Sequence, residues 1–159
     1  MMVNGQQVAN IAKLLRLSWI STLALALLLG GSASLAQQSA IVIGNDRGGL
    51  IGARASEITD ILNVGSRVEI RGSICYSSCT MYLGAGNVCV APDTSFGFHG
   101  PSDYGRSLSA ERFEHWSQVM ARHYREPLRS WFMTSARYES ARFVTLTGAQ
   151  LINMGYSRC

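Results

Sequence analysis

Short apolar runs and helically spaced apolar residues alternate through the first part of the chain beyond residue 38. Runs rich in apolar and β-branched residues at 39–43, 68–70, 88–91 and 96–99 predict four strands. Between them, apolar residues recur every three or four positions and predict an amphipathic helix over residues 50–62. A mostly small and apolar stretch at 77–85 predicts a buried helix. The alternation of strand and helix predicts an α/β domain with a parallel sheet covered by helices.

The second part of the chain is helical in pattern. Leu108, Phe113, Trp116, Met120 and Tyr124 form one stripe of a helix over residues 109–125, on which His115 and His123 are expected to face solvent.

Three further signals mark the ends of later helices. Pro127 suits the first turn of the next helix. Thr147 and Gln150 form a capping-box pattern that opens a last short helix, and Gly155 suits its C-terminal end.

The first 36 residues have the pattern of an export signal. Lys13 and Arg16 precede an apolar stretch at 17–29, and Ser34-Leu35-Ala36 fits a cleavage site after small residues. The alternative is an uncleaved anchor, but thirteen helical residues span only about 20 Å, less than the ~30 Å hydrocarbon core. We therefore expect a signal peptide at 1–36, a mature domain at 37–159, a periplasmic or secreted location, and membrane contact only through the signal.

The charge of the mature chain is low. The whole chain carries a net charge of +4, and removal of Lys13 and Arg16 leaves +2, because all ten acids lie beyond the signal. The arginines are scattered rather than clustered. This pattern argues against nucleic-acid binding.

Four cysteines lie in the mature chain: Cys75, Cys79, Cys89 and Cys159. An even count in a small exported domain predicts two disulfides, and the sequence leaves all three pairings open. A cysteine metal site is the rival interpretation. It lacks the paired Cys-x-x-Cys spacing and histidine partners that such sites use.

Three segments could carry chemistry. Gly48-Gly49 lies where a strand meets a helix, so its N–H groups could bind an oxyanion, although paired glycines are usually only turns. Ser77 lies in a loop that enters a buried helix and is equally a helix cap or a nucleophile. His99 ends an apolar strand at the rim, where a histidine is often merely exposed. The combination of these three segments favours an activated serine with a nearby base.

These segments together resemble the Clp protease proteolytic subunit and the crotonase-like superfamily. The similar stretches are residues 41–49, a strand with a glycine turn; 75–86, a nucleophile segment and its helix; 92–101, a strand ending in histidine; and 146–156, a closing segment. The pattern is nearest to small exported bacterial Clp-like proteins with a Cys-x-Ser-x-Cys segment. The resemblance implies a reduced α/β fold of Clp/crotonase type, mostly parallel, with a helical C-terminal region.

The resemblance also implies roles for individual residues. Ser77 matches the nucleophile and His99 the general base, while Gly49 and Ser78 match the two residues whose N–H groups form the oxyanion hole. Ser77 rather than Ser78 is matched because it keeps the nine-residue distance to Gly86.

The chain departs from the family at three points. The position of the family's triad aspartate falls near Phe143, so Glu139 is the expected third member and Asp103 a second candidate. Arg47 replaces the proline of the glycine turn. The family's preceding strand-helix unit has no counterpart in the mature chain, which predicts an exposed sheet edge.

The expected function is therefore an exported serine hydrolase or peptidase acting on a peptide or acyl substrate. No cofactor, metal, nucleotide or ATPase partner is implied, and a homo-oligomer is possible. The rival is a non-catalytic exported binding or structural protein on the same scaffold, favoured by the missing aspartate. An acyl-CoA enzyme of crotonase type is a third class, disfavoured by export away from coenzyme A.

Overall fold

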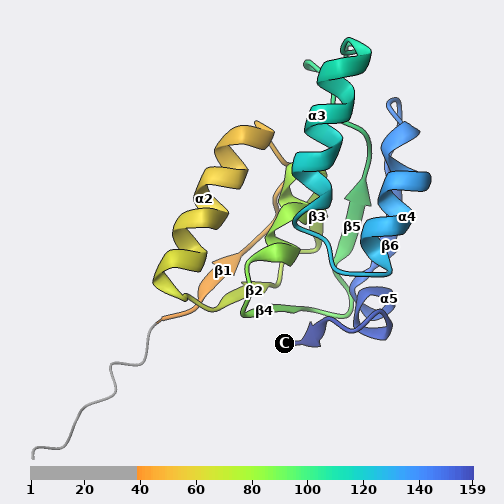
Figure 1. Ribbon diagram of the computed structural model, residues 1–159. Coiled ribbons are helices and arrows are strands. Elements are labelled where there is room, and N and C mark those ends of the chain that lie inside the picture. Colours follow the sequence, from red (N-terminus) through yellow and green to blue (C-terminus); the bar gives the residue numbers. More distant parts are fainter. Residues whose placement is uncertain (1–38) are drawn as a thin grey trace, which may run out of the picture. The chain divides into compact units, whose positions relative to one another are not determined.

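Short strands form two sheets in residues 39–159, the part of the chain that the computed structural model describes (Figure 1). Sheet A has the order β1 (Ile41–Ile43), β2 (Val68–Ile70), β4 (Val88–Val90) and β7 (Ser157–Arg158), all parallel. Sheet B has the order β3 (Ile74–Tyr76), β5 (Ser95–Phe98) and β6 (Val144–Thr147); β3 and β5 are parallel, and β5 and β6 are antiparallel. The structure is thus α/β with mostly parallel pairing.

The prediction of one sheet was wrong, because the chain divides its strands between two. The segment expected to be a loop before Ser77 contains β3, and β6 lies just before the capping box. Strand β3 pairs with β5 so that Tyr76 lies opposite Gly97. Strands of three or four residues have no clear periodic signal of their own, and only the partner strand makes them recognisable.

The helices and 3-10 helices connect these strands. They are α2 (Ile51–Val64), η2 (Ser77–Gly84), α3 (Ala110–Ala121), α4 (Leu128–Thr134), η3 (Ala136–Tyr138) and α5 (Gly148–Asn153). The helix expected at 50–62 is confirmed and runs two residues further. The buried helix expected at 77–85 forms as the 3-10 helix η2, whose residues 78–83 are all buried.

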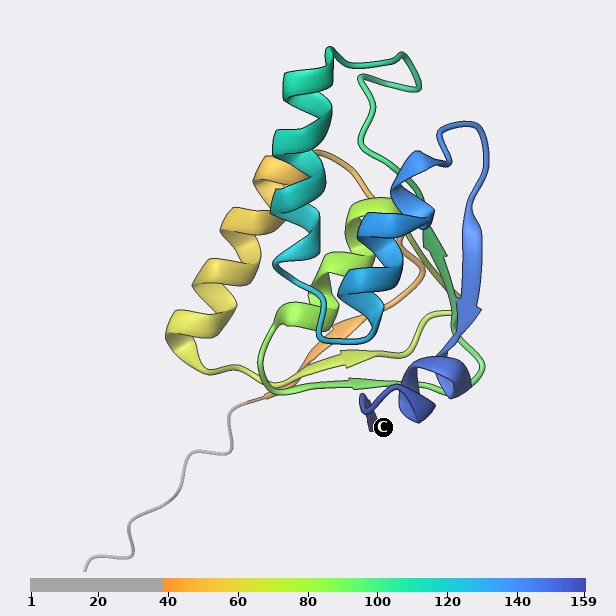
Figure 2. The same ribbon diagram turned by 45° about the vertical axis from the view of Figure 1, so that its right-hand side comes forward.

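Helix α2 packs on η2, and α3 contacts both α2 and α4 (Figures 1 and 2). Helix η2 also contacts β4 and β5, so it lies against strands of both sheets. Fully buried side chains come from every layer and include Ile58, Ile70, Leu83, Phe98 and Phe132. The core therefore surrounds η2, the element that begins with Ser77.

Local signals for the helix ends are largely confirmed. The Thr147 side chain and the Gln150 side chain form the reciprocal capping box that the sequence predicts. Pro127 directly precedes α4, and Gly155 has a φ of +97° just beyond α5. Helix α3 ends at Ala121, four residues earlier than expected.

The two histidines of the α3 segment differ. His115 is exposed, as expected. His123 lies beyond the end of α3 and is half-buried, with its Nδ1 2.9 Å from the carbonyl oxygen of Val119. Its backbone packs so close to Gly84 that a Cβ there would lie 2.7 Å from the His123 Cα. The expectation that His123 faces solvent was therefore wrong.

The proposed signal at 1–36 lies outside the described residues. Within residues 39–159, no helix combines the length and the apolar character needed to cross a bilayer. Strand β1 is the outermost strand of sheet A in this part of the chain, and its Val42 is exposed.

Candidate active site

Ser77 lies at a sharp turn between β3 and η2. Its φ is +56°, in the left-handed region that non-glycine residues rarely adopt, whereas the preceding Tyr76 is extended. Such a backbone costs on the order of 1–3 kcal/mol, and the surrounding structure must hold it in place.

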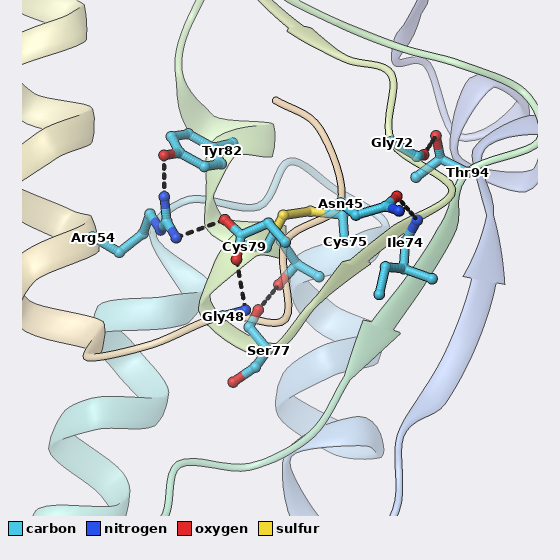
Figure 3. Close-up of a disulfide and its surroundings, with 12 residues drawn as sticks. Asn45, Gly48, Arg54, Gly72, Ile74, Cys75, Ser77, Cys79, Tyr82 and Thr94 are labelled. Carbon is cyan, nitrogen blue, oxygen red and sulfur yellow. Dashed lines mark hydrogen bonds and ion pairs between the residues drawn. A yellow bond between two sulfur atoms is a disulfide. The ribbon is translucent and has the colours of Figure 1, made fainter. Parts of the chain in front are cut away.

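Two sets of contacts hold the Ser77 backbone. The sulfur atoms of Cys75 and Cys79 lie at disulfide distance on either side of the turn, with a Cα–Cα separation of 5.2 Å (Figure 3). The Thr80 hydroxyl donates to the Ser77 carbonyl at 2.7 Å and lies 2.7 Å from the buried Tyr124 hydroxyl. Because the one proton of Thr80 goes to Ser77, the Tyr124 hydroxyl is the donor in the second bond.

The Ser77 side chain faces His99. The Oγ of Ser77 lies 2.7 Å from the Nε2 of His99, within hydrogen-bonding distance. Strands β3 and β5 are parallel neighbours, so their carboxyl ends meet at one sheet edge and bring the two residues together. Ser78, in contrast, is fully buried, and its hydroxyl has no hydrogen-bond partner in the described part of the chain. Of the two serines, only Ser77 is placed beside the imidazole.

The His99 imidazole is largely surrounded by protein. The Phe143 ring meets it edge to face at a centroid distance of 5.0 Å, and Phe143 itself packs on Tyr76 at 4.7 Å. Burial lowers the pKa of His99, and a weaker opposing effect comes from a hydrogen bond with the Gly100 backbone. His99 is therefore neutral at pH 7 and able to accept a proton.

The acids expected as third triad members have other partners. The Glu139 carboxylate binds Arg142 at 3.1 Å, and only the Glu139 backbone carbonyl reaches the His99 region, where it accepts from the Gly100 N–H at 2.9 Å. The Asp103 carboxylate pairs with Arg106 at 2.8 Å. Within residues 39–159, His99 has no hydrogen bond to a carboxylate. The structure places Phe143, near the position of the missing acid, against the ring instead.

Gly48 brings the glycine turn against Ser77. Gly48 has a φ of +92°, and a Cβ placed on it would lie 2.6 Å from the Ser77 Cβ and 3.0 Å from the Ser78 nitrogen. Only glycine permits this approach. The Gly48 N–H donates to Asp46 at 2.7 Å, so it is occupied. Gly49, the next residue, lines the same cavity as Ser77 and lies just before the N-terminus of α2.

A side-chain network that the sequence analysis missed supports this turn. Asp46 accepts from the Gly48 N–H and also pairs with Arg54 of α2 at 2.7 Å. Arg54 in turn contacts the Tyr82 hydroxyl, and its guanidinium lies 4.3 Å from the Tyr82 ring centroid (Figure 3). The Asp46-x-Gly48 spacing is a known turn signal that could have identified Asp46. Nothing local could have identified Arg54 or Tyr82.

A cavity of about 650 Å³ opens beside the serine and histidine. Its lining includes Ser77, His99, Leu50, Ile51, Leu108 and Trp116. The walls come from the start of α2, from α3 and from the segment that follows β5. The pair therefore stands at the edge of a mainly apolar cavity large enough for a small organic group.

The remaining cysteines pair between β4 and the residue that follows β7. The sulfur atoms of Cys89 and Cys159 also lie at disulfide distance, with a Cα–Cα separation of 4.9 Å, and no cysteine in the described residues is free. The sequence left three pairings open, and the structure has Cys75–Cys79 and Cys89–Cys159. Within residues 39–159, no cluster of three or more His, Cys, Asp or Glu side chains could hold a metal ion.

Comparison with family models, curated proteins and solved structures found no match to this chain.

Proposed function

We propose that this protein is an exported serine hydrolase of peptidase type, with Ser77 as nucleophile and His99 as general base. The contact of 2.7 Å between the Ser77 Oγ and the His99 Nε2 carries the proposal. A base must lie within hydrogen-bonding reach of the proton that it removes, and this pair meets that condition at the edge of a cavity. The fold would be a reduced Clp/crotonase type, and the location periplasmic or secreted.

The proposed reaction is acyl transfer to Ser77 followed by hydrolysis. The Ser77 oxygen attacks the carbonyl carbon of a peptide or ester while its proton moves to the His99 Nε2. The proton then passes to the leaving group, and a water molecule releases the acyl group by the reverse sequence. The N–H groups of Gly49 and Ser78 are the proposed donors to the oxyanion, since the Gly48 N–H already binds Asp46.

Among the described residues, no carboxylate is placed to orient the histidine of the dyad. In a serine protease, loss of the correct tautomer lowers kcat by a factor of about 10⁴. Here the edge-to-face Phe143 ring limits how the imidazole can turn while its Nε2 stays within reach of the Ser77 oxygen. We therefore expect a slow hydrolase, whose reactivity is best detected with an irreversible probe.

The decisive experiment is labelling of the purified oxidised protein with a fluorophosphonate probe. We expect the unaltered protein to be labelled, and Ser77→Ala and His99→Ala to lose labelling. Ser107→Ala and His115→Ala are matched controls, because both residues are exposed and neither lines the cavity. Both controls should label at the normal rate. Equal labelling of all five proteins, or of none, would reject the hydrolase.

A non-catalytic binding protein is the second candidate. One observation favours it: Phe143 lies against His99, and the nearest candidate acids bind arginines. In that case the cavity would bind a ligand without reaction. An acyl-CoA enzyme remains the least favoured proposal, because coenzyme A is not expected outside the cytoplasm.

A further inference from the structure

One side of helix α3 lines the cavity beside Ser77, and its residues change from buried and apolar to exposed and charged along the helix. Met120, Trp116 and Arg112 all line the cavity and follow one another at intervals of four residues. The three positions span about 12 Å along the helix axis. Met120 is buried, Trp116 half-buried and Arg112 exposed, so this side of the helix runs from an apolar interior to a charged mouth. Trp116 lies against Gly52 of α2, where a Cβ would stand 3.5 Å from its ring.

The guanidinium of Arg112 has no partner within residues 39–159. The Arg112 backbone N–H donates to the Ser109 hydroxyl at the start of α3, and no hydrogen bond or ion pair joins the Arg112 guanidinium to any described residue. Most other arginines near the site are paired: Arg54 with Asp46, Arg106 with Asp103, and Arg137 with Glu114. An arginine that lines a cavity without a carboxylate partner is available to bind one from a ligand.

The other charged groups at the cavity do not neutralise Arg112. Among the described residues that line the cavity, Asp103 is the one carboxylate, and Arg106 already binds it at 2.8 Å. The N-terminus of α2 also faces the cavity, has no acidic residue in its first turn and lacks a side-chain cap. Helix N-termini carry a partial positive charge. With His99 neutral, the mouth of the cavity is net positive.

We propose that the cavity binds the acyl part of a substrate that is apolar along its length and ends in a carboxylate. The apolar stretch would lie against Ile51, Leu108 and Trp116, and the carboxylate would pair with Arg112. This inference rests on the proposed function, because it takes the reacting carbonyl to lie at Ser77. Acyl groups of equal length without the terminal charge would bind more weakly.

The test compares matched ligands on the Ser77→Ala protein, which can bind but cannot react. The probes are the mono-N-methylamides of succinic, adipic and suberic acids, each beside the N-methylamide of the monocarboxylic acid with the same number of carbons. Binding is followed by tryptophan fluorescence, because Trp116 lines the cavity. We expect the anionic probe of at least one length to bind about threefold more tightly at low salt, with the preference shrinking as salt is added.

Two further variants in the Ser77→Ala background assign this preference to Arg112. Arg112→Met should remove it, and Arg158→Met should keep it, because Arg158 is an exposed arginine of β7 outside the cavity. Circular dichroism and the unfolding midpoint confirm that both variants fold. Equal binding of charged and neutral probes at every length, or an undiminished preference in Arg112→Met, overturns the inference. If the unaltered protein is labelled by the fluorophosphonate but charged and neutral probes bind equally, only this inference is rejected. If the anionic probes bind more tightly but no labelling occurs, the hydrolase is rejected and a carboxylate-binding cavity remains.

Discussion

His99 has a hydroxyl on one side and a phenyl ring on the other. The Ser77 Oγ lies 2.7 Å from its Nε2, and the Phe143 ring meets it edge to face. Aromatic edge-to-face pairs contribute about 0.5–1.5 kcal/mol beyond the area that they bury. In the proposed mechanism Phe143 would therefore be a positioning residue, because its ring limits the rotation of the imidazole and covers part of it. Gly97 makes room for this arrangement, because a Cβ there would lie 2.6 Å from Tyr76 and 3.0 Å from Phe143.

The pH dependence of fluorophosphonate labelling should report the state of His99. In the proposed mechanism only a neutral His99 can accept the serine proton, so the labelling rate should rise with pH through the pKa of His99. Burial lowers that pKa, so the midpoint should lie below the ordinary value of about 6.5. Labelling rates measured between pH 4.5 and 8 give this midpoint.

Substitutions at Phe143 extend this prediction. Phe143→Ala exposes the imidazole to water and should move the midpoint up toward about 6.5. Phe143→Leu keeps an apolar cover and should move it less. A midpoint above that of an ordinary histidine, or one that ignores Phe143→Ala, would contradict the proposed role of Phe143.

At the scale of elements, the site depends on the docking of the glycine turn onto the start of η2. The Tyr76 N–H donates to the Asp46 carbonyl at 2.9 Å, and the Asp46 N–H donates to the Ile74 carbonyl at 3.2 Å. The turn thus pairs with β3 by backbone bonds, while Arg54 of α2 holds its Asp46 side chain. Two elements that follow one another in sequence, the turn and α2, are both needed to place the proposed oxyanion donor.

Substitution of Gly48 should disturb this docking. Gly48→Ala forces a Cβ into contact with Ser77 and Ser78 and gives alanine a positive φ. We expect the free energy of unfolding to fall by about 2–4 kcal/mol and labelling to slow strongly. Gly44→Ala is the matched control, since a Cβ there meets nothing within 4 Å. It should change stability by no more than about 0.5 kcal/mol. Equal effects of the two variants would show that Gly48 has no special role.

At the scale of the whole described unit, the two cysteine pairs act on different properties. Cys89–Cys159 joins β4 to the end of the chain across a sequence separation of 70, beside the pairing of β4 with β7. Cys75–Cys79 spans only four positions, but it brackets Ser77. In the entropy account, the stabilisation from a disulfide grows with the length of the loop that it closes. The Cys89–Cys159 pair should therefore contribute more to the free energy of unfolding, and the Cys75–Cys79 pair should contribute more to the geometry of the Ser77 turn.

Double variants separate these two effects. Cys89→Ala with Cys159→Ala should lower the free energy of unfolding by about 4 kcal/mol, and Cys75→Ala with Cys79→Ala should lower it by about 2 kcal/mol. The labelling rate should fall more in the Cys75→Ala, Cys79→Ala variant than in the Cys89→Ala, Cys159→Ala variant, because only the Cys75–Cys79 pair holds the Ser77 turn. Chemical denaturation and labelling kinetics measure both. If the second pair had the larger effect on stability and the smaller effect on labelling, this division of roles would be wrong.

Much of the scaffold was determined by the sequence alone. Helical spacing predicted α2 to within two residues at its C-terminal end, and the Thr147–Gln150 pattern predicted the start of α5. These features depend on residues within one or two turns of each other, so local sequence contains all the information. Ser77 and His99 were candidates because Ser77 lies in a loop that enters a predicted buried helix, because His99 ends an apolar strand, and because both match positions in the family that the sequence resembles.

The tertiary structure alone decided how these elements pair and what surrounds the histidine. The split into two sheets, the β3–β5 pairing and the Cys89–Cys159 pairing all join residues far apart in the sequence. The same is true of the Tyr82–Arg54 contact and of Phe143 against His99. Contacts of this kind arise when separate elements pack into one core. The local sequence around a short strand or a single aromatic residue does not identify the residue that it will contact.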